Sequence, residues 1–244
     1  MPLPKLLQSV AKRYYRLRRD PIIAYRLGAR FLLDPRNWID NRILSSAPYE
    51  VDQLRHATEL ITSQKLDGFI DVGANIGLYS VLLGRLPEIK QVIAFEPMRR
   101  NYAQLQANLY LNQLEDKVEP FRRALGATPG EATLHIDPRS TGLARLALEG
   151  AERDPRVFTH KETVAVIRFD EHHPLTGRRL FLKIDAEGHA AGVLQGMRQL
   201  FARNYVVTQV ELTQVEKAPV GDFFRELGHR TGPCLGLDQI FLPA

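Results

Sequence analysis

The sequence predicts an α/β protein, in which a doubly wound, mostly parallel sheet follows an N-terminal helical extension. From Phe69 onward, short apolar runs alternate with helical stretches, which is the pattern of βαβ units. The first two runs each end in an acidic residue, Asp71 and Glu96. The 244 residues suit one domain with an extension, because a single core can grow to roughly 250 residues before a chain splits.

The extension begins with a predicted basic amphipathic helix that ends before Asp20-Pro21. Residues 1–30 hold eight Lys and Arg residues against Asp20 alone, whereas the whole chain has a net charge of +5. We expect this helix to pack on its own domain or a second subunit, or to contact an acidic glycan or an anionic membrane surface. Its apolar positions recur at three- and four-residue steps: Leu3, Leu6, Leu7, Val10, Tyr14 and Leu17.

The remaining elements follow in order. Residues 31–43 form a predicted turn-rich lead-in, and the domain boundary falls between residues 1–48 and 49–244. Predicted helices cover 49–62, 77–86, 99–112, 189–202 and 219–228. Predicted strands cover 68–72, 91–95, 117–124, 131–136, 163–168, 179–184, 205–211 and 237–242.

Composition predicts an ordinary globular protein, with 44% hydrophobic and 25% charged residues. No run approaches the roughly 20 apolar residues of a membrane span, so we expect no membrane crossing and no secretion. Cys234 is the single cysteine, which excludes an intramolecular disulfide and favours a reducing compartment such as the cytoplasm. We expect Cys234 to be a buried apolar thiol.

A ligand-binding loop follows the first predicted strand of the sheet. Gly73 and Gly77 allow a tight turn and close approach of a ligand, and the next helix offers free amide donors. Asp71 would repel a pyrophosphate but accept hydrogen bonds from an ammonium group. A dinucleotide loop needs G-x-G-x-x-G, and here Asn75 and Leu78 replace its second and third glycines. In the alternative interpretation, the glycines only shape a strand-to-helix turn.

The second strand ends in Glu96-Pro97, and Glu96 lies 19 residues beyond Gly77. A spacing of roughly 20 residues is expected for an acid that accepts hydrogen bonds from both ribose hydroxyls. Asp71 and Glu96 would therefore flank one crevice, which predicts a nucleoside ligand with a cationic end. Taken alone, Glu96 could be a solvated acid at a strand end.

The chain resembles the FkbM-type class I methyltransferases from about residue 31 to the C-terminus. The residues that carry this resemblance are Asp71-Val72-Gly73-Ala74-Asn75-Ile76-Gly77-Leu78-Tyr79-Ser80, Phe95-Glu96-Pro97 with Asn101, Leu105 and Asn108, and Leu182-Lys183-Ile184-Asp185-Ala186-Glu187-Gly188 with Val193-Leu194-Gln195-Gly196. The resemblance implies a Rossmann-like fold, S-adenosylmethionine as methyl donor, and O-methylation of sugars, glycans or polyketide-like products. The residues expected to bind the cofactor are Glu50, Asp71, Gly73, Asn75, Gly77, Ser80, Glu96 and Pro97.

The candidate catalytic residues are Asp185, Glu187 and His189, which follow a central strand whose end opens into the same crevice. A hydroxyl is a poor nucleophile, so Asp185 or His189 would remove its proton. The family usually has a second glutamate where this chain has Ala190. In the alternative interpretation, the acids only cap the next helix or bind Lys183.

The sequence also bears on metal ions and partners. Glu211 could join Asp185 in holding Mg²⁺, but two acids are too few, so Mg²⁺ stays open and no metal ligand is assigned. The expected acceptor is a small molecule or glycan. The Arg residues within 137–162, a variable insertion that could form the acceptor pocket, are compatible with an anionic acceptor or with a solvated loop. Nucleic acid is not expected, since no Asn-Pro-Pro-aromatic element follows the central strand. The Arg and Ser residues named for the segment 137–162 are Arg139, Ser140, Arg145 and Arg153.

A second function stays open beside O-methyl transfer. Because Ala190 replaces the expected acid, the domain could bind the nucleoside without transferring a methyl group and act as an interaction module. The peripheral membrane contact through residues 1–30, at the inner membrane surface, also stays open. The oligomeric state is not determined by the sequence.

Overall fold

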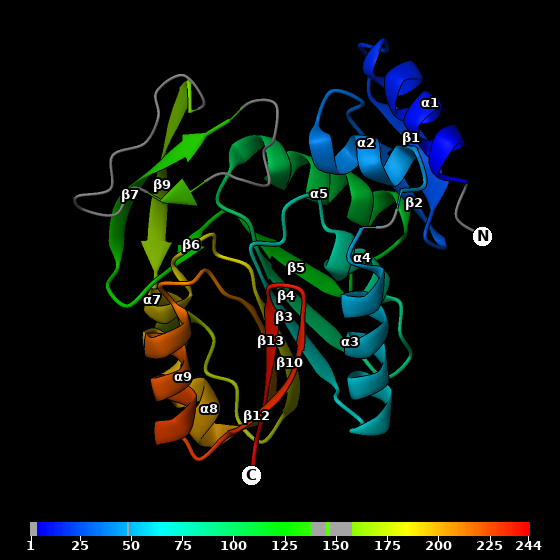
Figure 1. The fold of residues 1–244 in the computed structure, drawn as a ribbon. Helices are drawn as coiled ribbons and strands as arrows, with labels where there is room; N and C mark the ends of the chain where they lie inside the picture. Colours follow the sequence, from blue (N-terminus) through cyan, green and yellow to red (C-terminus); the bar gives the residue numbers. More distant parts are fainter. Residues whose placement is uncertain (1–3, 48, 138–144, 147–157) are drawn as a thin grey trace.

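The computed structural model describes residues 4–47, 49–137, 145–146 and 158–244. A seven-stranded sheet with the order β12-β13-β11-β10-β3-β4-β5 lies at its centre (Figure 1). The strands from β11 to β5 run parallel, and β13 and β12 continue the sheet antiparallel at one edge. The predicted doubly wound, mostly parallel sheet is therefore confirmed. Its strands are β3 (Gly68–Val72), β4 (Gln91–Phe95), β5 (Val118–Phe121), β10 (Arg179–Ile184), β11 (Tyr205–Glu211), β12 (Arg230–Leu235) and β13 (Asp238–Leu242).

Helices cover both faces of this sheet (Figure 1). The side chains of β3 alternate between the two helix layers, with Phe69 in one core and Ile70 in the other, as the two-residue period of a strand requires. One layer contains α3 (Val51–Ser63), α4 (Leu78–Gly84) and α5 (Arg99–Leu111). The other contains α6 (Phe169–His172), α7 (Ala190–Gln195), α8 (Arg198–Arg203) and α9 (Lys217–Glu226).

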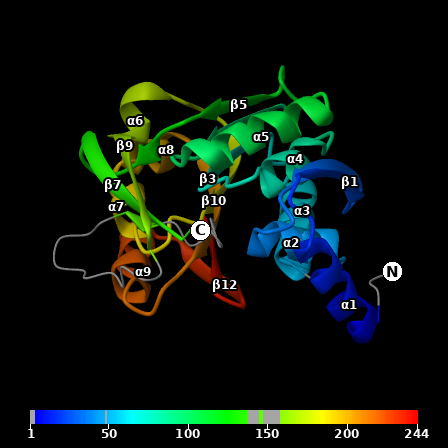
Figure 2. The same ribbon diagram turned by 90° about the horizontal axis from the view of Figure 1, so that it is seen from above.

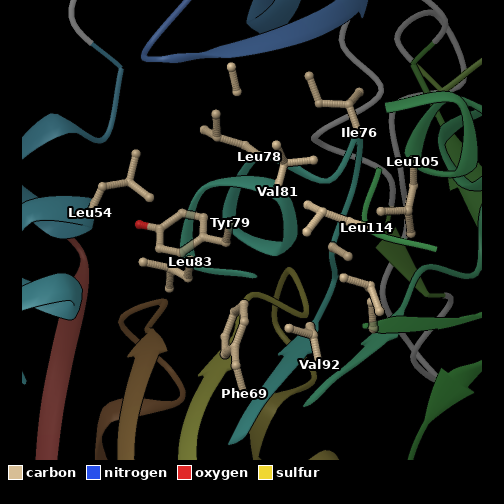
Figure 3. Close-up of a cluster of buried hydrophobic side chains, with 14 of the residues drawn as sticks. Leu54, Phe69, Ile76, Leu78, Tyr79, Val81, Leu83, Val92, Leu105 and Leu114 are labelled. Carbon is tan, nitrogen blue, oxygen red and sulfur yellow. The ribbon is translucent and has the colours of Figure 1, made fainter. Parts of the chain in front are cut away.

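The core beneath α3, α4 and α5 is dense and almost entirely apolar. Figure 3 shows Phe69 and Val92 rising from the strands to meet Tyr79 and Val81 of α4. These side chains are at most 4% exposed. Burial of large apolar side chains of this kind is the main term that stabilises the sheet–helix contact. The first turn of α4 is thereby fixed against the end of β3, where the glycine loop lies.

The N-terminal part contains more regular structure than the sequence predicted. It consists of α1 (Lys5–Arg16), β1 (Ile22–Arg26), β2 (Ala29–Leu33) and α2 (Trp38–Leu44), so the predicted turn-rich lead-in is largely a strand and a helix. The predicted first helix is present, but it ends at Arg16, before Asp20-Pro21 is reached. β1 and β2 form an antiparallel hairpin whose turn places both Leu27 and Gly28 at positive φ.

The β2–α2 segment is attached to α5 by buried and partly buried polar contacts. The Asn108 side chain accepts a hydrogen bond from the Leu32 amide at 2.6 Å and donates one to the Ile76 carbonyl at 2.8 Å. Gln104 donates to the Leu32 carbonyl at 2.8 Å and to the Asp40 carboxylate at 2.7 Å. The free edge of β2 is satisfied in this way, and apolar residues of the segment, Ala29, Phe31, Leu33, Ile39, Ile43 and Leu44, join the core of the sheet.

A second, four-stranded sheet with the order β6-β9-β7-β8 lies between β5 and β10 in the sequence. It accounts for the predicted strands at 131–136 and 163–168. The strand predicted at 117–124 lies in the central sheet and ends at Phe121, and Ala124 pairs in the second sheet instead. Of the predicted acceptor insertion, Arg139, Ser140 and Arg153 lie outside the described residues, and so does the side chain of Arg145. The strands are β6 (Ala124–Leu125), β7 (Gly130–Ile136), β8 (Arg145–Leu146) and β9 (His160–Ile167).

Three further sequence predictions need correction. The predicted helix at 189–202 is two short helices, because the chain breaks at Gly196 and Met197. β12 was not predicted, since its sequence contains Gly232 and Pro233, which are depleted in strands. Cys234 lies on this edge strand and is exposed, so the prediction of a buried thiol is wrong. None of the described helices combines the length and apolar character required to cross a bilayer.

The Asn108 contacts generate a stability prediction. Asn108→Ala leaves the partly buried Leu32 amide and the buried Ile76 carbonyl without their partner, so we expect the free energy of unfolding to fall by about 2–4 kcal/mol. Asn112→Ala is the matched control, because Asn112 makes comparable contacts with Arg30 in an exposed position. Its cost should be about 1 kcal/mol or less. Urea denaturation measures both, and equal costs would contradict the role assigned to Asn108.

Candidate functional site

The carboxyl end of β3 places a buried carboxylate beside the glycine loop. Asp71 is 1% exposed and accepts a hydrogen bond from the Ser80 hydroxyl at 2.6 Å. Burial raises the pKa of Asp71 to about 6, although the nearby Lys183 charge opposes that rise. Asp71 and Ser80, both predicted to bind the cofactor, therefore lie together, and the orientation of the carboxylate is fixed by the first turn of α4.

The loop after β3 is held closely against the end of β10. Gly73 has a φ of +81°, and a Cβ built there would lie 1.9 Å from the Asp185 carbonyl oxygen. The Asp185 amide in turn donates to the Val72 carbonyl at 2.9 Å. Gly77, at a φ of +85°, begins α4 in contact with Leu105. Only a residue without a Cβ fits at Gly73, which brings the loop and Asp185 to one point.

Glu96 follows β4 and lies beside the same loop. One carboxylate oxygen accepts from the Asn75 amide and the other from the Met98 amide, each at 2.8 Å. Burial raises the pKa of Glu96 to about 8, against the effect of these two amide donors. Each carboxylate oxygen has a second lone pair, so Glu96 keeps acceptor capacity toward a ligand in the cavity it lines.

A buried lysine lies at the centre of the acidic groups. Lys183 is 3% exposed and pairs with Asp185 at 3.2 Å, and its ammonium lies 4.7 Å from the centre of the Tyr79 ring. Burial alone would lower the pKa of Lys183, but the charges of Asp185 and Glu50 raise it above its ordinary value. Lys183 therefore stays positively charged and stabilises the ionised form of the carboxylates around it.

Glu50 reaches this cluster from the start of α3. It adopts a left-handed backbone conformation with a φ of 51°, and it lines one cavity together with Tyr49 and Tyr79. Burial raises the pKa of Glu50, and the Lys183 charge opposes the rise. The acid that the family resemblance placed near the donor pocket thus lies beside Asp71 and Lys183.

Two cavities meet along the carboxyl ends of β3, β4 and β10. The larger contains Glu96, Pro97 and the side chains after β10, while the smaller contains Glu50, Asp71 and Lys183. The residues that line both cavities are Gly73, Asn75 and Asp185.

Asn75 provides a test of whether a ligand fits this junction. Its side-chain oxygen is buried and has no hydrogen-bond partner within the part of the chain that the structure describes. An unpaired buried oxygen costs free energy, so an acceptor in this position is expected to meet a donor on a ligand. Ammonium and ribose hydroxyl groups are both such donors. The residues present therefore fit a nucleoside with a cationic end.

The segment after β10 places the three candidate catalytic residues differently. Asp185 lies at the junction of the two cavities, whereas Glu187 and His189 line only the larger one. The His189 ring packs over Gly192, where a Cβ would lie 2.7 Å from it. Burial lowers the pKa of His189, so its imidazole is neutral at neutral pH and is part of the cavity wall rather than a fully exposed residue.

Sequence reasoning missed Glu216. The Glu216 carboxylate accepts from the Ala190 amide at 2.7 Å and from the Thr213 hydroxyl at 2.7 Å. The first amide of α7 is therefore capped by a distant acid rather than by Asp185 or Glu187. Glu216 precedes α9 without a sequence pattern that links it to α7, so only the three-dimensional arrangement identifies it.

The carboxylates of Asp185, Glu187 and Glu211 lie close together, with one oxygen of each within 4.8 Å of the others. Burial raises the pKa of Glu211 to about 8, and the Asp185 charge adds to the rise. A divalent cation takes oxygen ligands of this kind. However, the Lys183 ammonium already supplies a positive charge to Asp185. We therefore assign no metal to the cluster.

Comparison with known proteins agrees with this geometry. The Methyltransferase FkbM domain matches residues 71–231, which include the glycine loop, Glu96 and the segment after β10. The chain belongs to the FkbM methyltransferase family. The fold is that of the class I methyltransferases, for which S-adenosylmethionine is the expected methyl donor.

Two fungal methyltransferases are similar in sequence. Methyltransferase 1 of Beauveria bassiana is 24% identical over 147 residues, which cover 54% of this chain and 59% of that protein. Methyltransferase sdnD of Sordaria araneosa is 34% identical over 80 residues, covering 33% of this chain and 31% of that protein. The matched region thus spans between about a third and three fifths of the length of these relatives.

Two solved structures share the fold. The methyltransferase FkbM of Methylobacillus flagellatus has a TM-score of 0.50 and 15% identity, covering 72% of this chain and 44% of that one. A protein from Pyrococcus horikoshii solved as a candidate transferase has a TM-score of 0.54 and 13% identity, and the match covers 99% of this chain and 85% of that one. At these identities the likeness concerns the fold alone.

The contact at Gly73 generates a second prediction. Gly73→Ala forces either the loop or the end of β10 to move, and we expect it to destabilise the protein by about 3 kcal/mol or more and to abolish nucleoside binding. Gly188→Ala is the control, since Gly188 also has a positive φ but no atom within 4 Å of a built Cβ. It should cost about 1–2 kcal/mol. Thermal unfolding distinguishes the two; similar shifts would contradict the close contact.

Proposed function

We propose that this protein is an S-adenosylmethionine-dependent O-methyltransferase whose acceptor is a hydroxyl group of a sugar, a glycan or glycolipid, or a related natural product. The observation that carries the proposal is the pair of cavities that join at Asp185, with Glu96 in one and Asp71 in the other. A nucleoside needs an apolar cavity with an acceptor for its ribose, and an amino-acid end needs buried carboxylates. The larger cavity offers the first of these and the smaller cavity the second, and the two cavities adjoin as the two ends of the cofactor do.

The cofactor is assigned to the two cavities by chemistry. Glu96 accepts hydrogen bonds from the ribose hydroxyls, and Phe95, Pro97 and Leu125 provide apolar surface for the base. Asp71 and Glu50 accept from the ammonium group of the amino-acid end, with Ser80 orienting Asp71. Asn75, whose side-chain oxygen is unpaired, lines both cavities.

Asp185 is the proposed general base. Bound S-adenosylmethionine supplies a methyl group carried on a positively charged sulfur, which keeps the electron pair when the bond breaks. Asp185 accepts the proton of the acceptor hydroxyl as the new carbon–oxygen bond forms. Its position at the junction of the cavities favours it over His189, which lines only the larger cavity.

The acceptor and the compartment are inferred from other features of the chain. A hydroxyl acceptor follows from the family resemblance and from carboxylates that accept hydroxyl protons near the junction. A cytoplasmic location is supported by the single cysteine, Cys234, which is exposed and unpaired with another cysteine. No metal is required by the proposal, because Lys183 provides positive charge at Asp185.

The donor assignment is tested with two ligands and two variants. S-adenosylhomocysteine carries both the ribose and the ammonium group, whereas 5′-methylthioadenosine lacks the amino-acid end. Asp71→Asn should weaken binding of the first by about 10–100-fold, the effect of losing one charge-assisted contact, and leave the second unchanged. Glu96→Gln should weaken both. Asp67→Asn, at the opposite end of β3, is the control and should change neither.

Isothermal titration calorimetry measures these affinities, and retained binding of 5′-methylthioadenosine shows that Asp71→Asn is folded. If Asp71→Asn weakens both ligands equally, the amino-acid end does not lie in the smaller cavity. If no adenosine compound binds the unchanged protein, the proposed function is wrong.

The catalytic assignment is tested by methyl transfer to a panel of sugars and glycolipids, followed through release of S-adenosylhomocysteine. For an acceptor that reacts, Asp185→Asn should lower kcat by about 10²–10⁴-fold without changing cofactor affinity. His189→Gln should lower kcat far less. The opposite ranking would make His189 the base.

The non-catalytic alternative is judged by the same assay. It is favoured by Ala190, which stands where the family usually has an acid, although Glu216 brings a carboxylate to the Ala190 amide. Cofactor binding without transfer to any acceptor, with Asp185→Asn indistinguishable from the unchanged protein, would support an interaction module.

A further inference from the structure

The apolar side of α1 faces away from the rest of the molecule. Leu6 is 77% exposed, Val10 59%, Tyr14 54% and Leu17 84%. These positions recur at three- and four-residue steps, so they form one stripe along the helix. Among the described residues, no element covers this stripe. The expectation that the helix packs on its own domain therefore does not account for its apolar side.

A different side of α1 contacts the domain. Ala11, Lys12 and Tyr15 are partly buried, and the Lys12 carbonyl accepts a hydrogen bond from the Asn41 side chain of α2 at 3.3 Å. Tyr15 packs on the core and receives a 3.5 Å contact from the Arg26 guanidinium. These contacts fix the rotation of α1 about its axis, and this rotation turns the apolar stripe outward.

Positive charge borders the exposed stripe. Arg13 and Arg16 lie on α1, Arg18 and Arg19 follow it, and all four are exposed. The single acid in residues 1–30 is Asp20. A helix with exposed apolar residues between basic ones has the composition of an interfacial helix at an anionic lipid surface.

The β1–β2 hairpin extends the same end of the molecule. Figures 1 and 2 both show α1 and β1 together at the end remote from α9. Ile23 and Tyr25 share the outward face of β1 and are 60% and 67% exposed, and Leu27 at the turn is 47% exposed. Apolar surface on two neighbouring elements exceeds the scattered single residues that are normal on a soluble domain.

We propose that α1 and the β1 face form a docking surface for an anionic lipid bilayer. The apolar stripe enters the boundary between headgroups and acyl chains, and the arginines that border it contact lipid phosphates and carboxylates. α2, on which α1 packs, contributes Ile39 to the smaller cavity, so the docked surface lies one helix away from the methyl-donor site.

Charge argues against a second copy of the chain as the occupant. Pairing two such stripes would bring two sets of arginines together with only Asp20 from each copy to offset them. Like charges in contact are unfavourable, whereas an anionic surface attracts every one of these side chains. The lipid surface is therefore the occupant that satisfies both the apolar stripe and its basic border.

Co-sedimentation with vesicles tests the proposal on the full chain. The protein should bind vesicles of phosphatidylcholine mixed with phosphatidylserine at least about tenfold more tightly than vesicles of phosphatidylcholine alone, and added salt should reduce this difference. Leu6→Ser with Leu17→Ser should reduce binding by about tenfold or more, since it removes the apolar contact.

Arg13→Glu with Arg16→Glu should abolish the preference for phosphatidylserine. Arg203→Glu with Arg225→Glu is the matched control, because it changes net charge equally on exposed residues of α8 and α9, and binding should persist. All variants should give the circular dichroism spectrum and thermal unfolding of the unchanged protein, which shows that they are folded.

Two results would overturn the inference. One is equal binding, or none, to the two kinds of vesicle. The other is a dimer of the unchanged protein in solution that Leu6→Ser with Leu17→Ser converts to a monomer, because the stripe would then be a contact between copies. Both results are independent of cofactor binding, so the inference fails or stands separately from the proposed function.

Discussion

Lys183 is the one positive charge among the described buried groups at the centre of the site, and the arrangement of the site depends on it. Its ammonium pairs with Asp185 and offsets the charges of Glu50, Asp71 and Asp238, which reach it from α3, β3 and β13. Burial raises the pKa of Glu50, Asp71 and Asp238, and the Lys183 charge opposes each rise. Without Lys183, several carboxylates would repel one another in a region from which water is largely excluded. Elements far apart in the sequence are therefore held together around a single buried cation.

The sheet was predictable from the sequence because its strands are buried on both faces. A continuous apolar run such as Val92-Ile93-Ala94-Phe95 has apolar side chains on both faces of the strand, so both faces must be buried. The five parallel strands were each predicted within a few residues. The elements that the sequence missed lack this signal. The β1–β2 turn has Leu27 at positive φ rather than the usual Asn or Gly, and β12 contains Gly232 and Pro233. Their pairing is decided by partners elsewhere, such as Asn108 at the edge of β2.

The site was predictable to the extent that it follows strand ends. Asp71, Glu96 and Asp185 come directly at or after parallel strands, and topology alone brings such residues to one edge of the sheet. The outward rotation of α1 was not predictable, because periodicity identifies an apolar stripe without stating which way it faces. Glu216 and the distinct positions of Asp185 and His189 were not predictable either. They depend on the path of the chain between β10 and α9, which no local sequence pattern encodes.

The second sheet leaves and rejoins the main domain at neighbouring points. β6 and β9 pair in parallel, with Ala124 beside Val166 and Leu125 beside Ile167, so the chain returns to where it departed before it enters β10. A segment whose two ends adjoin can lengthen, shorten or be replaced at little entropic cost to the elements that flank it. The second sheet is thus an insertion beside a fixed chemical centre, and its Leu134 forms part of the wall of the larger cavity, so exchanging it would alter that wall while the strands that hold the carboxylates remain in place.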